Sequence, residues 1–192
     1  MAPIFRVMAV LAIWMLCAKE TEGSHSPAPA SGASALLPVC CFLVVILRSH
    51  VGMAVTFPWN TGAVWPVLCV IAVGIGKAAG GILAARWGTR PAVCVSLTLA
   101  AVCYALSDSP VFGVAALFFF NITMPITLYL LVQKWPELPG FSFGFLTFGL
   151  FLGFLPTYFG ADAWISAGMI GAVGSLLSLA LLAPAFRKAA KP

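Results

Sequence analysis

The sequence predicts an all-α, polytopic integral membrane protein with six transmembrane helices and a partial hydrophobic helix at the N-terminus. Three observations support this fold class. Hydrophobic residues make up 62% of the 192 residues and charged residues only 8%, whereas a soluble domain has roughly 45–50% and 25%. Apolar runs of about 20 residues, the length that crosses a bilayer as a helix, recur along the chain. These runs are apolar on every face, which excludes the alternating pattern of a membrane β-barrel.

The chain divides into three parts. Residues 1–18 hold a short apolar run that we expect to be a partial helix, entering from outside or lying in the interface, with a cleaved signal peptide as the alternative. Residues 19–35 are polar, small and proline-containing, and predict a flexible cytoplasmic linker. Residues 36–192 form the six-helix membrane domain. Its expected helices are Leu36–Trp59, Gly62–Ala85, Pro91–Ser107, Pro110–Val132, Phe141–Gly160 and Ala163–Phe186.

The breaks between these helices have local chemical causes. Turn residues separate the first helix from the second, the third from the fourth and the fifth from the sixth. Between the fourth and fifth helices, Pro136 and Pro139 prevent the helix from continuing. Each expected helix therefore ends where the sequence gives a reason for it to end.

The basic residues set the expected orientation. In the six-helix region, alternate loops hold all the lysines and arginines outside the helices: Arg86, Arg90, Lys134, Arg187, Lys188 and Lys191. The opposite loops hold only Asp108 and Asp162. By the positive-inside rule the basic loops and the C-terminus are cytoplasmic, so we expect a multi-pass protein of the cell membrane. The net charge of +5 is scattered rather than gathered into a stripe, so no nucleic acid partner is expected.

No feature of the sequence indicates an enzyme. The chain has no nucleophile elbow, no phosphate-binding loop, no zinc-binding helix motif and no paired carboxylates inside a helix. We therefore expect no catalytic residue, no cofactor and no metal site. The six cysteines, at positions 17, 40, 41, 69, 94 and 103, lie in or beside apolar stretches without metal-ligand spacing and are expected to be free thiols.

The most informative string is GILAARWGTRP, which begins at Gly81 and forms a turn between two expected helices. It resembles the signature loop of major facilitator superfamily transporters, G-x-x-x-[DN]-[RK]-x-G-x-[RK]-[RK]. Gly81, Arg86, Gly88 and Arg90 match in register, whereas Ala85 replaces the acidic residue and Pro91 the last basic one. Gly88 suits a tight reversal, and the two arginines reach helix-end carbonyls or lipid phosphates. An ordinary positive-inside turn is the alternative interpretation.

The resemblance extends from about Leu36 to the end of the chain and covers the C-terminal half of such a transporter, helices seven to twelve. It implies transport of a small solute by alternating access. The candidate class of solute, an organic anion, comes instead from Arg48, which has no acidic residue to pair with inside the helices. One half makes one wall of the cavity, so the implied partners are the lipid bilayer, the solute, and either a second copy or a separate N-terminal half. The alternative is a membrane anchor that stabilises a complex without transporting, or a remnant of a transporter.

Arg48 lies within the Leu36–Trp59 helix, and no Asp or Glu lies in any of the six helices. A charge at this depth is expensive and needs a partner, a cavity or water. Arg48 is therefore either an anion-binding residue of a translocation cavity, or it bonds to Asn121, Thr123 or the carbonyls of a helix break, or the helix ends earlier than expected. His50 lies about 200° around the helix from Arg48, and is either a proton-coupling residue or a packed histidine.

The helix Pro110–Val132 carries the other candidate substrate-binding residues, Asn121, Thr123 and Thr127. Pro125 frees a backbone carbonyl near residue 121, so this polar patch lines a cavity or, alternatively, packs against a neighbouring helix. Lys77 is expected to extend toward the inner surface, with a substrate contact as the second interpretation.

Overall fold

The computed structural model describes residues 35–160 and 167–189, and these residues form helices without any strand. The helices are α2 (Leu36–Ala54), α3 (Val64–Trp87), α4 (Thr89–Ala105), α5 (Pro110–Asn121), α6 (Thr123–Lys134), α7 (Pro139–Tyr158) and α8 (Ala167–Ala189). The prediction of an all-α chain is confirmed for this part of the sequence. The expected partial helix 1–18, residues 19–34 of the expected linker and the loop that holds Asp162 lie outside the described residues.

Among the described helices, four are long and apolar enough to cross a membrane. They are Leu36–Ala54, Val64–Trp87, the α5–α6 pair Pro110–Lys134, and Pro139–Tyr158. The two other apolar helices, Thr89–Ala105 and Gly168–Pro184, are shorter. At 1.5 Å per residue, a helix of 17 residues spans about 25 Å, which lies at the lower limit for a bilayer core.

The two largest differences from the sequence prediction both involve proline, whereas the other described helices begin and end within a few residues of the expected bounds. The first helix ends at Ala54 rather than Trp59, with Val55 already extended. Pro58 disfavours a helical conformation of the residue before it, so the chain leaves the helix before reaching the proline. The expected single helix 110–132 is divided at Ile122 into α5 and α6. Pro125 has no N–H to donate to the carbonyl four residues earlier, which weakens the helix at this point.

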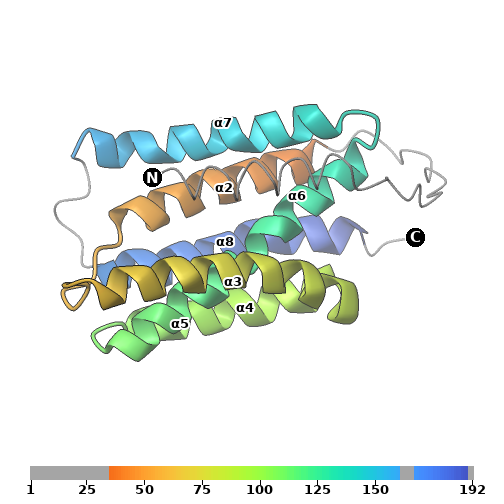
Figure 1. The fold of residues 1–192 in the computed structure, drawn as a ribbon. Coiled ribbons are helices and arrows are strands. Elements are labelled where there is room, and N and C mark those ends of the chain that lie inside the picture. Colours follow the sequence, from red (N-terminus) through yellow and green to blue (C-terminus); the bar gives the residue numbers. More distant parts are fainter. Residues whose placement is uncertain (1–34, 161–166, 190–192) are drawn as a thin grey trace, which may run out of the picture. The chain divides into compact units, whose positions relative to one another are not determined.

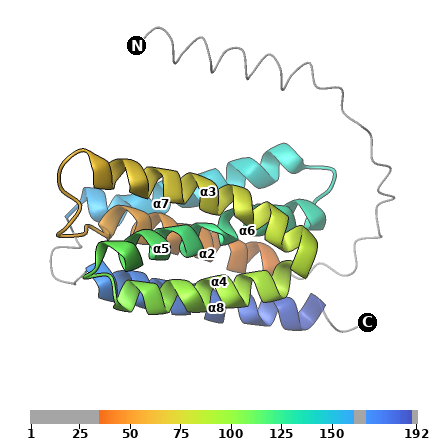
Figure 2. The same cartoon turned by 60° about the horizontal axis from the view of Figure 1, so that its bottom comes forward.

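The packing of the helices follows an exchange rule. Helix α2 packs against α7 and α8, and the α5–α6 pair packs in the same way against α3 and α4 (Figures 1 and 2). The rule exchanges α2 with the α5–α6 pair, α3 with α7, and α4 with α8. Under this exchange, the contacts of α2 with α7 and α8 become the contacts of the α5–α6 pair with α3 and α4. Two further pairs, α4 with α8 and α2 with α6, are converted into themselves, whereas the smaller contacts of α3 with α4 and of α6 with α7 do not follow the rule. The described helices therefore fall into two three-helix units whose main contacts match.

Glycines at equivalent places mediate these contacts. A Cβ atom on Gly80 of α3 would collide with the carbonyl oxygen of Ile122, and one on Gly153 of α7 would collide with the carbonyl oxygen of Ile46. One turn earlier, Gly76 lies against the Phe118 carbonyl oxygen, 2.5 Å from where a Cβ would stand, and Gly149 lies against α2. Each glycine of α7 follows its counterpart in α3 by 73 residues. Small residues let helices approach closely, so α3 and α7 use the same device on their partner helices.

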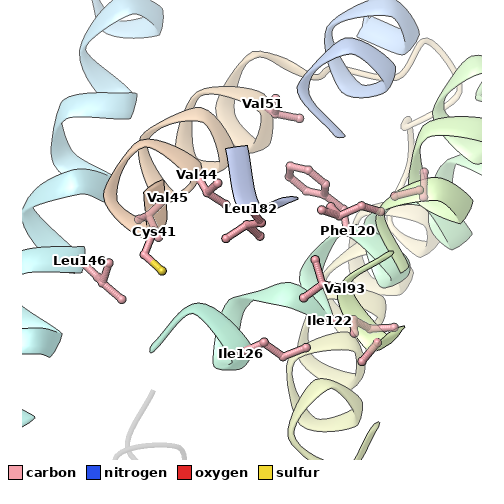
Figure 3. Packing of buried hydrophobic residues seen from close by; sticks show 14 of the residues in the cluster. Cys41, Val44, Val45, Val51, Val93, Phe120, Ile122, Ile126, Leu146 and Leu182 are labelled. Carbon is pink, nitrogen blue, oxygen red and sulfur yellow. The ribbon is translucent and has the colours of Figure 1, made fainter. Parts of the chain in front are cut away.

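The core lies between the two units. Figure 3 shows Cys41, Val44 and Val45 of α2 facing Leu182 of α8, with Phe120 beyond it. Ile122 and Ile126 extend this cluster along the α5–α6 pair. All these side chains are buried, so helices from both units are held by one continuous apolar core.

Trp59 joins two loops at one end of the bundle. Its indole N–H donates a hydrogen bond of 2.8 Å to the carbonyl oxygen of Ser107. Its ring stacks on Phe57 with centroids 4.7 Å apart and lies where a Cβ of Gly113 would stand. The α2–α3 loop and the α4–α5 turn are thereby fixed to each other.

Candidate functional site

Arg48 is enclosed by the helical bundle. Only 5% of its surface is exposed, although it lies six residues before the end of α2, about 9 Å from that end at 1.5 Å per residue. The early end of α2 therefore places Arg48 nearer to one side of the bundle than the sequence suggested. It faces the α5–α6 pair rather than the surface.

The hydrogen bonds of Arg48 go to the helix break. Its Nη2 donates a hydrogen bond of 2.9 Å to the carbonyl oxygen of Phe120 and a second hydrogen bond to Thr123 Oγ1. The guanidinium carbon lies 5.0 Å from the centroid of the Phe120 ring, a cation–π distance. No described residue accepts a hydrogen bond from Nε or Nη1. The described bonds are thus those of the second interpretation of Arg48, in which it bonds to Thr123 and to a carbonyl of the break.

The polar residues of the α5–α6 pair do not gather around Arg48 as a group. Thr123 is fully buried, and its hydroxyl donates a hydrogen bond of 3.1 Å to the Phe120 carbonyl oxygen. Thr123 therefore shares that acceptor with Arg48. The Asn121 amide donates 2.8 Å to Leu117 of its own helix. Thr127 is also buried and donates 2.8 Å to the Met124 carbonyl oxygen. Of the three candidates, only Thr123 contacts Arg48 through a hydrogen bond.

His50, the candidate for proton coupling, is half-buried two residues after Arg48. Two residues rotate a helix by about 200°, so the two side chains leave α2 on different faces. A shared site of Arg48 and His50 is not present in this arrangement.

The turn around Gly88, which the sequence analysis compared with a transporter signature, is a very tight connection between two helices. Helix α3 ends at Trp87 and α4 begins at Thr89, so Gly88 alone joins them. Gly88 has a φ of +86°, a conformation that glycine adopts without steric cost. Arg86, Arg90 and Gly81 are exposed. A groove of about 540 Å³ between this connection and α6 is lined by Gly81, Ala84, Ala85, Gly88, Thr89, Pro125, Ile126, Tyr129 and Gln133, without a charged residue.

A second groove, of about 230 Å³, contains a charge. Its walls come from α2, α3, α6 and α7, and we call it the Lys77 groove. It is lined by Val45, Lys77, Met124, Pro125, Thr127, Leu128, Phe143, Leu146, Thr147 and Leu150. It brings together Lys77 and Thr127, which the sequence analysis considered separately, with Thr147, which it missed. The signal that could have indicated Thr147 is a hydroxyl side chain near the middle of a mainly apolar, glycine-rich helix.

The described residues offer no acidic partner inside the helices. Asp108 and Glu137 are the described acidic residues, and both lie between helices. No group of histidine, cysteine, aspartate or glutamate suited to a metal ion occurs among the described residues. The chain matches no protein-family model, no curated protein and no solved structure.

Proposed function

We propose that this chain is an integral membrane protein of six spanning helices that forms one half of a solute transporter working by alternating access, as its resemblance to major facilitator transporters implies. The observation that carries the proposal is the exchange rule of the helix contacts. Transporters of this superfamily build each half from two three-helix repeats of opposite orientation. The described helices fall into two three-helix units whose main contacts match and whose glycine contacts match.

The proposal includes the two shorter helices as spans. Helix α4 has 17 residues, which meets the lower limit of about 17–25 residues for a transmembrane helix. Its unit counterpart α8 has a similarly short apolar part. The basic ends of α3 and α6, at Arg86 and Lys134, are the cytoplasmic ends in this arrangement.

A partner is needed because the Lys77 groove is open on the outer side of the bundle. The two helices beside it, α3 and α7, are each only 22% buried along their apolar stretch, against 39% for α2 and for the α5–α6 pair. Val70 of α3 and Phe151 of α7 are among their exposed residues. A second copy or a separate half seated over this groove would convert it into the closed cavity that alternating access requires. The partner therefore covers α3 and α7 and leaves α4 and α8 facing lipid.

Site-directed crosslinking in native membranes tests this arrangement. A chain with Val70→Cys or Phe151→Cys should form an intermolecular crosslink, because both positions border the proposed partner surface. The matched controls are Val102→Cys of α4 and Leu176→Cys of α8, which are 53% and 54% exposed. The exposed native thiol of Cys94 is replaced by serine in every variant. Equal crosslinking at all four positions, or none at Val70 and Phe151, contradicts the proposal.

Labelling with an impermeant thiol reagent tests the orientation. Cysteines placed at Asn60 and Asp162 should react from outside the cell, whereas cysteines at Trp87 and Lys188 should react only after permeabilisation. The reverse pattern would overturn the cytoplasmic assignment of the basic loops.

A further inference from the structure

The Lys77 groove is the one described cavity in which a cation within a helix is exposed. Lys77 lies 13 residues after the start of α3 and 10 residues before its end, so about 15–20 Å of helix extends on either side. That distance exceeds the reach of a lysine side chain to either surface. Its position favours a contact in the groove over extension to the inner surface.

The exchange rule reveals a difference between the two walls of this groove. The position of α7 that corresponds to Lys77, 73 residues later, is Leu150, and both line the groove. Phe143 and Leu146 add apolar surface on the α7 side. The groove is therefore cationic on its α3 wall and, apart from the hydroxyl of Thr147, apolar on its α7 wall.

The other polar groups that line the groove are poor partners for the ammonium group of Lys77, because each already bonds to its own helix. The hydroxyls of Thr127 and Thr147 both donate to carbonyl oxygens of their own helices. The described residues contain no acid within any helix. An ammonium group in an apolar groove without an acid gains most from a ligand that supplies the negative charge.

We propose that the Lys77 groove binds a small amphipathic organic anion, with its carboxylate on the ammonium of Lys77 and its apolar body against Phe143, Leu146 and Leu150. This inference rests on the proposed function and names the class of its solute. The volume of about 230 Å³ lies below the roughly 300–1,000 Å³ of pockets for drug-sized ligands. The ligand is therefore a compact molecule rather than a long lipid.

The experiment measures equilibrium binding of radiolabelled 4-phenylbutyrate. The full chain is extracted in mild detergent with the subunits that remain bound to it and reconstituted into phosphatidylcholine nanodiscs. Two probes of the same shape, 4-phenylbutylamine and 4-phenylbutanol, carry a positive charge and no charge. The wild-type chain should bind the carboxylate saturably and about tenfold more tightly than the alcohol, and should bind the amine more weakly than either.

Lys77→Met is the main variant, because it keeps the length of the side chain and removes its charge. It should weaken binding of the carboxylate about tenfold and leave binding of the alcohol unchanged. Lys134→Met, which removes a lysine at the end of α6 outside the groove, is the matched control and should bind as wild type. Equal binding of the carboxylate by Lys77→Met and wild type would overturn the proposal.

Two further variants keep the test decisive if Lys77→Met does not fold. Lys77→Arg retains the charge and should retain binding of the carboxylate. Thr147→Phe places a large side chain at an exposed position of the groove wall and should abolish binding of both the carboxylate and the alcohol. Unchanged binding by Thr147→Phe would show that the probe does not occupy the groove.

A competition arm separates a free anion from an anionic lipid. Phosphatidylglycerol added to the nanodiscs should not displace the probe, and displacement would overturn the assignment to a compact solute. The binding test is independent of the crosslinking test. Crosslinking without binding rejects the groove ligand and leaves the half-transporter, whereas binding without crosslinking rejects the partner arrangement.

Discussion

Arg48 and Lys77 are single cations inside apolar helices, and their surroundings differ in almost every respect. Arg48 is enclosed and uses Nη2 to hold Phe120 and Thr123 at the break between α5 and α6. Lys77 is exposed in a groove and lies closer to the middle of its helix than Arg48 does. In the proposed arrangement Arg48 stabilises the fold through the acceptors of Nη2, whereas Lys77, for which no hydrogen bond to a described residue is found, is available to a ligand.

The largest expected effect is the loss of stability in Arg48→Ala. This variant removes the two hydrogen bonds to the helix break and leaves a cavity among α2, α4 and the α5–α6 pair. We expect the free energy of unfolding to fall by about 2–5 kcal/mol. Equilibrium unfolding of the reconstituted chain measures it. Arg48→Lys, which keeps a donor for the Phe120 carbonyl oxygen, should lose less, and equal stability of Arg48→Ala and wild type would contradict the structural role.

The next effect concerns the contacts that hold both cations in place. Gly80→Ala and Gly153→Ala force a Cβ against a backbone carbonyl of the partner helix, so each should lower the free energy of unfolding by about 1–3 kcal/mol. The matched controls are Gly81→Ala and Gly144→Ala, where a Cβ meets nothing within 4 Å. Thermal unfolding of the four variants measures the difference. Losses of the same size in controls and test variants would remove the support for close packing at these glycines.

A smaller effect is expected for Thr123→Val. The variant keeps the shape of the side chain but removes the hydroxyl that accepts from Arg48 and donates to the Phe120 carbonyl oxygen. We expect a loss of about 1 kcal/mol in the free energy of unfolding. Thr98→Val is the control, because Thr98 is exposed and bonds only to Cys94 of its own helix. An equal loss of unfolding free energy in Thr123→Val and Thr98→Val would contradict the role of the Thr123 hydroxyl.

The smallest expected effect is that of Lys77→Met on stability. Because Lys77 is exposed and no described residue forms an ion pair with it, the free energy of unfolding should change by no more than about 0.5 kcal/mol. The same unfolding assay measures this value. A loss as large as that of Arg48→Ala would show that Lys77 is a structural residue, and the contrast between the two cations would disappear.

The sequence predicted the helices better than it predicted their contacts. Apolar runs bounded by turn residues placed every described helix, because helix formation depends on local composition. The early end of α2 was missed, although Pro58 was a visible signal. Pro125 was expected to disturb the helix 110–132, but the boundary at Ile122 was not placed. The role of proline depends on whether tertiary contacts keep the helix continuous around it, and the sequence does not contain that information.

The candidate site was likewise predicted better in its residues than in its contacts. The scarcity of polar groups in the helices limited the partners of Arg48, so Thr123 and a carbonyl of the break were among the expected acceptors. The grouping of Lys77 with Thr127 and Thr147 was not expected, because these residues come from three helices. Their proximity depends on the glycine contacts of α3 and α7, which only the three-dimensional packing reveals.

The position of Arg48 in the chain has a consequence for biosynthesis. Its two hydrogen-bond acceptors lie 72 and 75 residues later. At about 5–20 residues per second, the ribosome adds that length in about 4–15 s. During this interval α2 has left the ribosome, while the acceptors for its arginine have not yet been synthesised. In the proposed membrane arrangement, α2 is best kept at the protein-lined edge of the insertion machinery until α5 and α6 emerge, and its release into lipid should depend on their arrival.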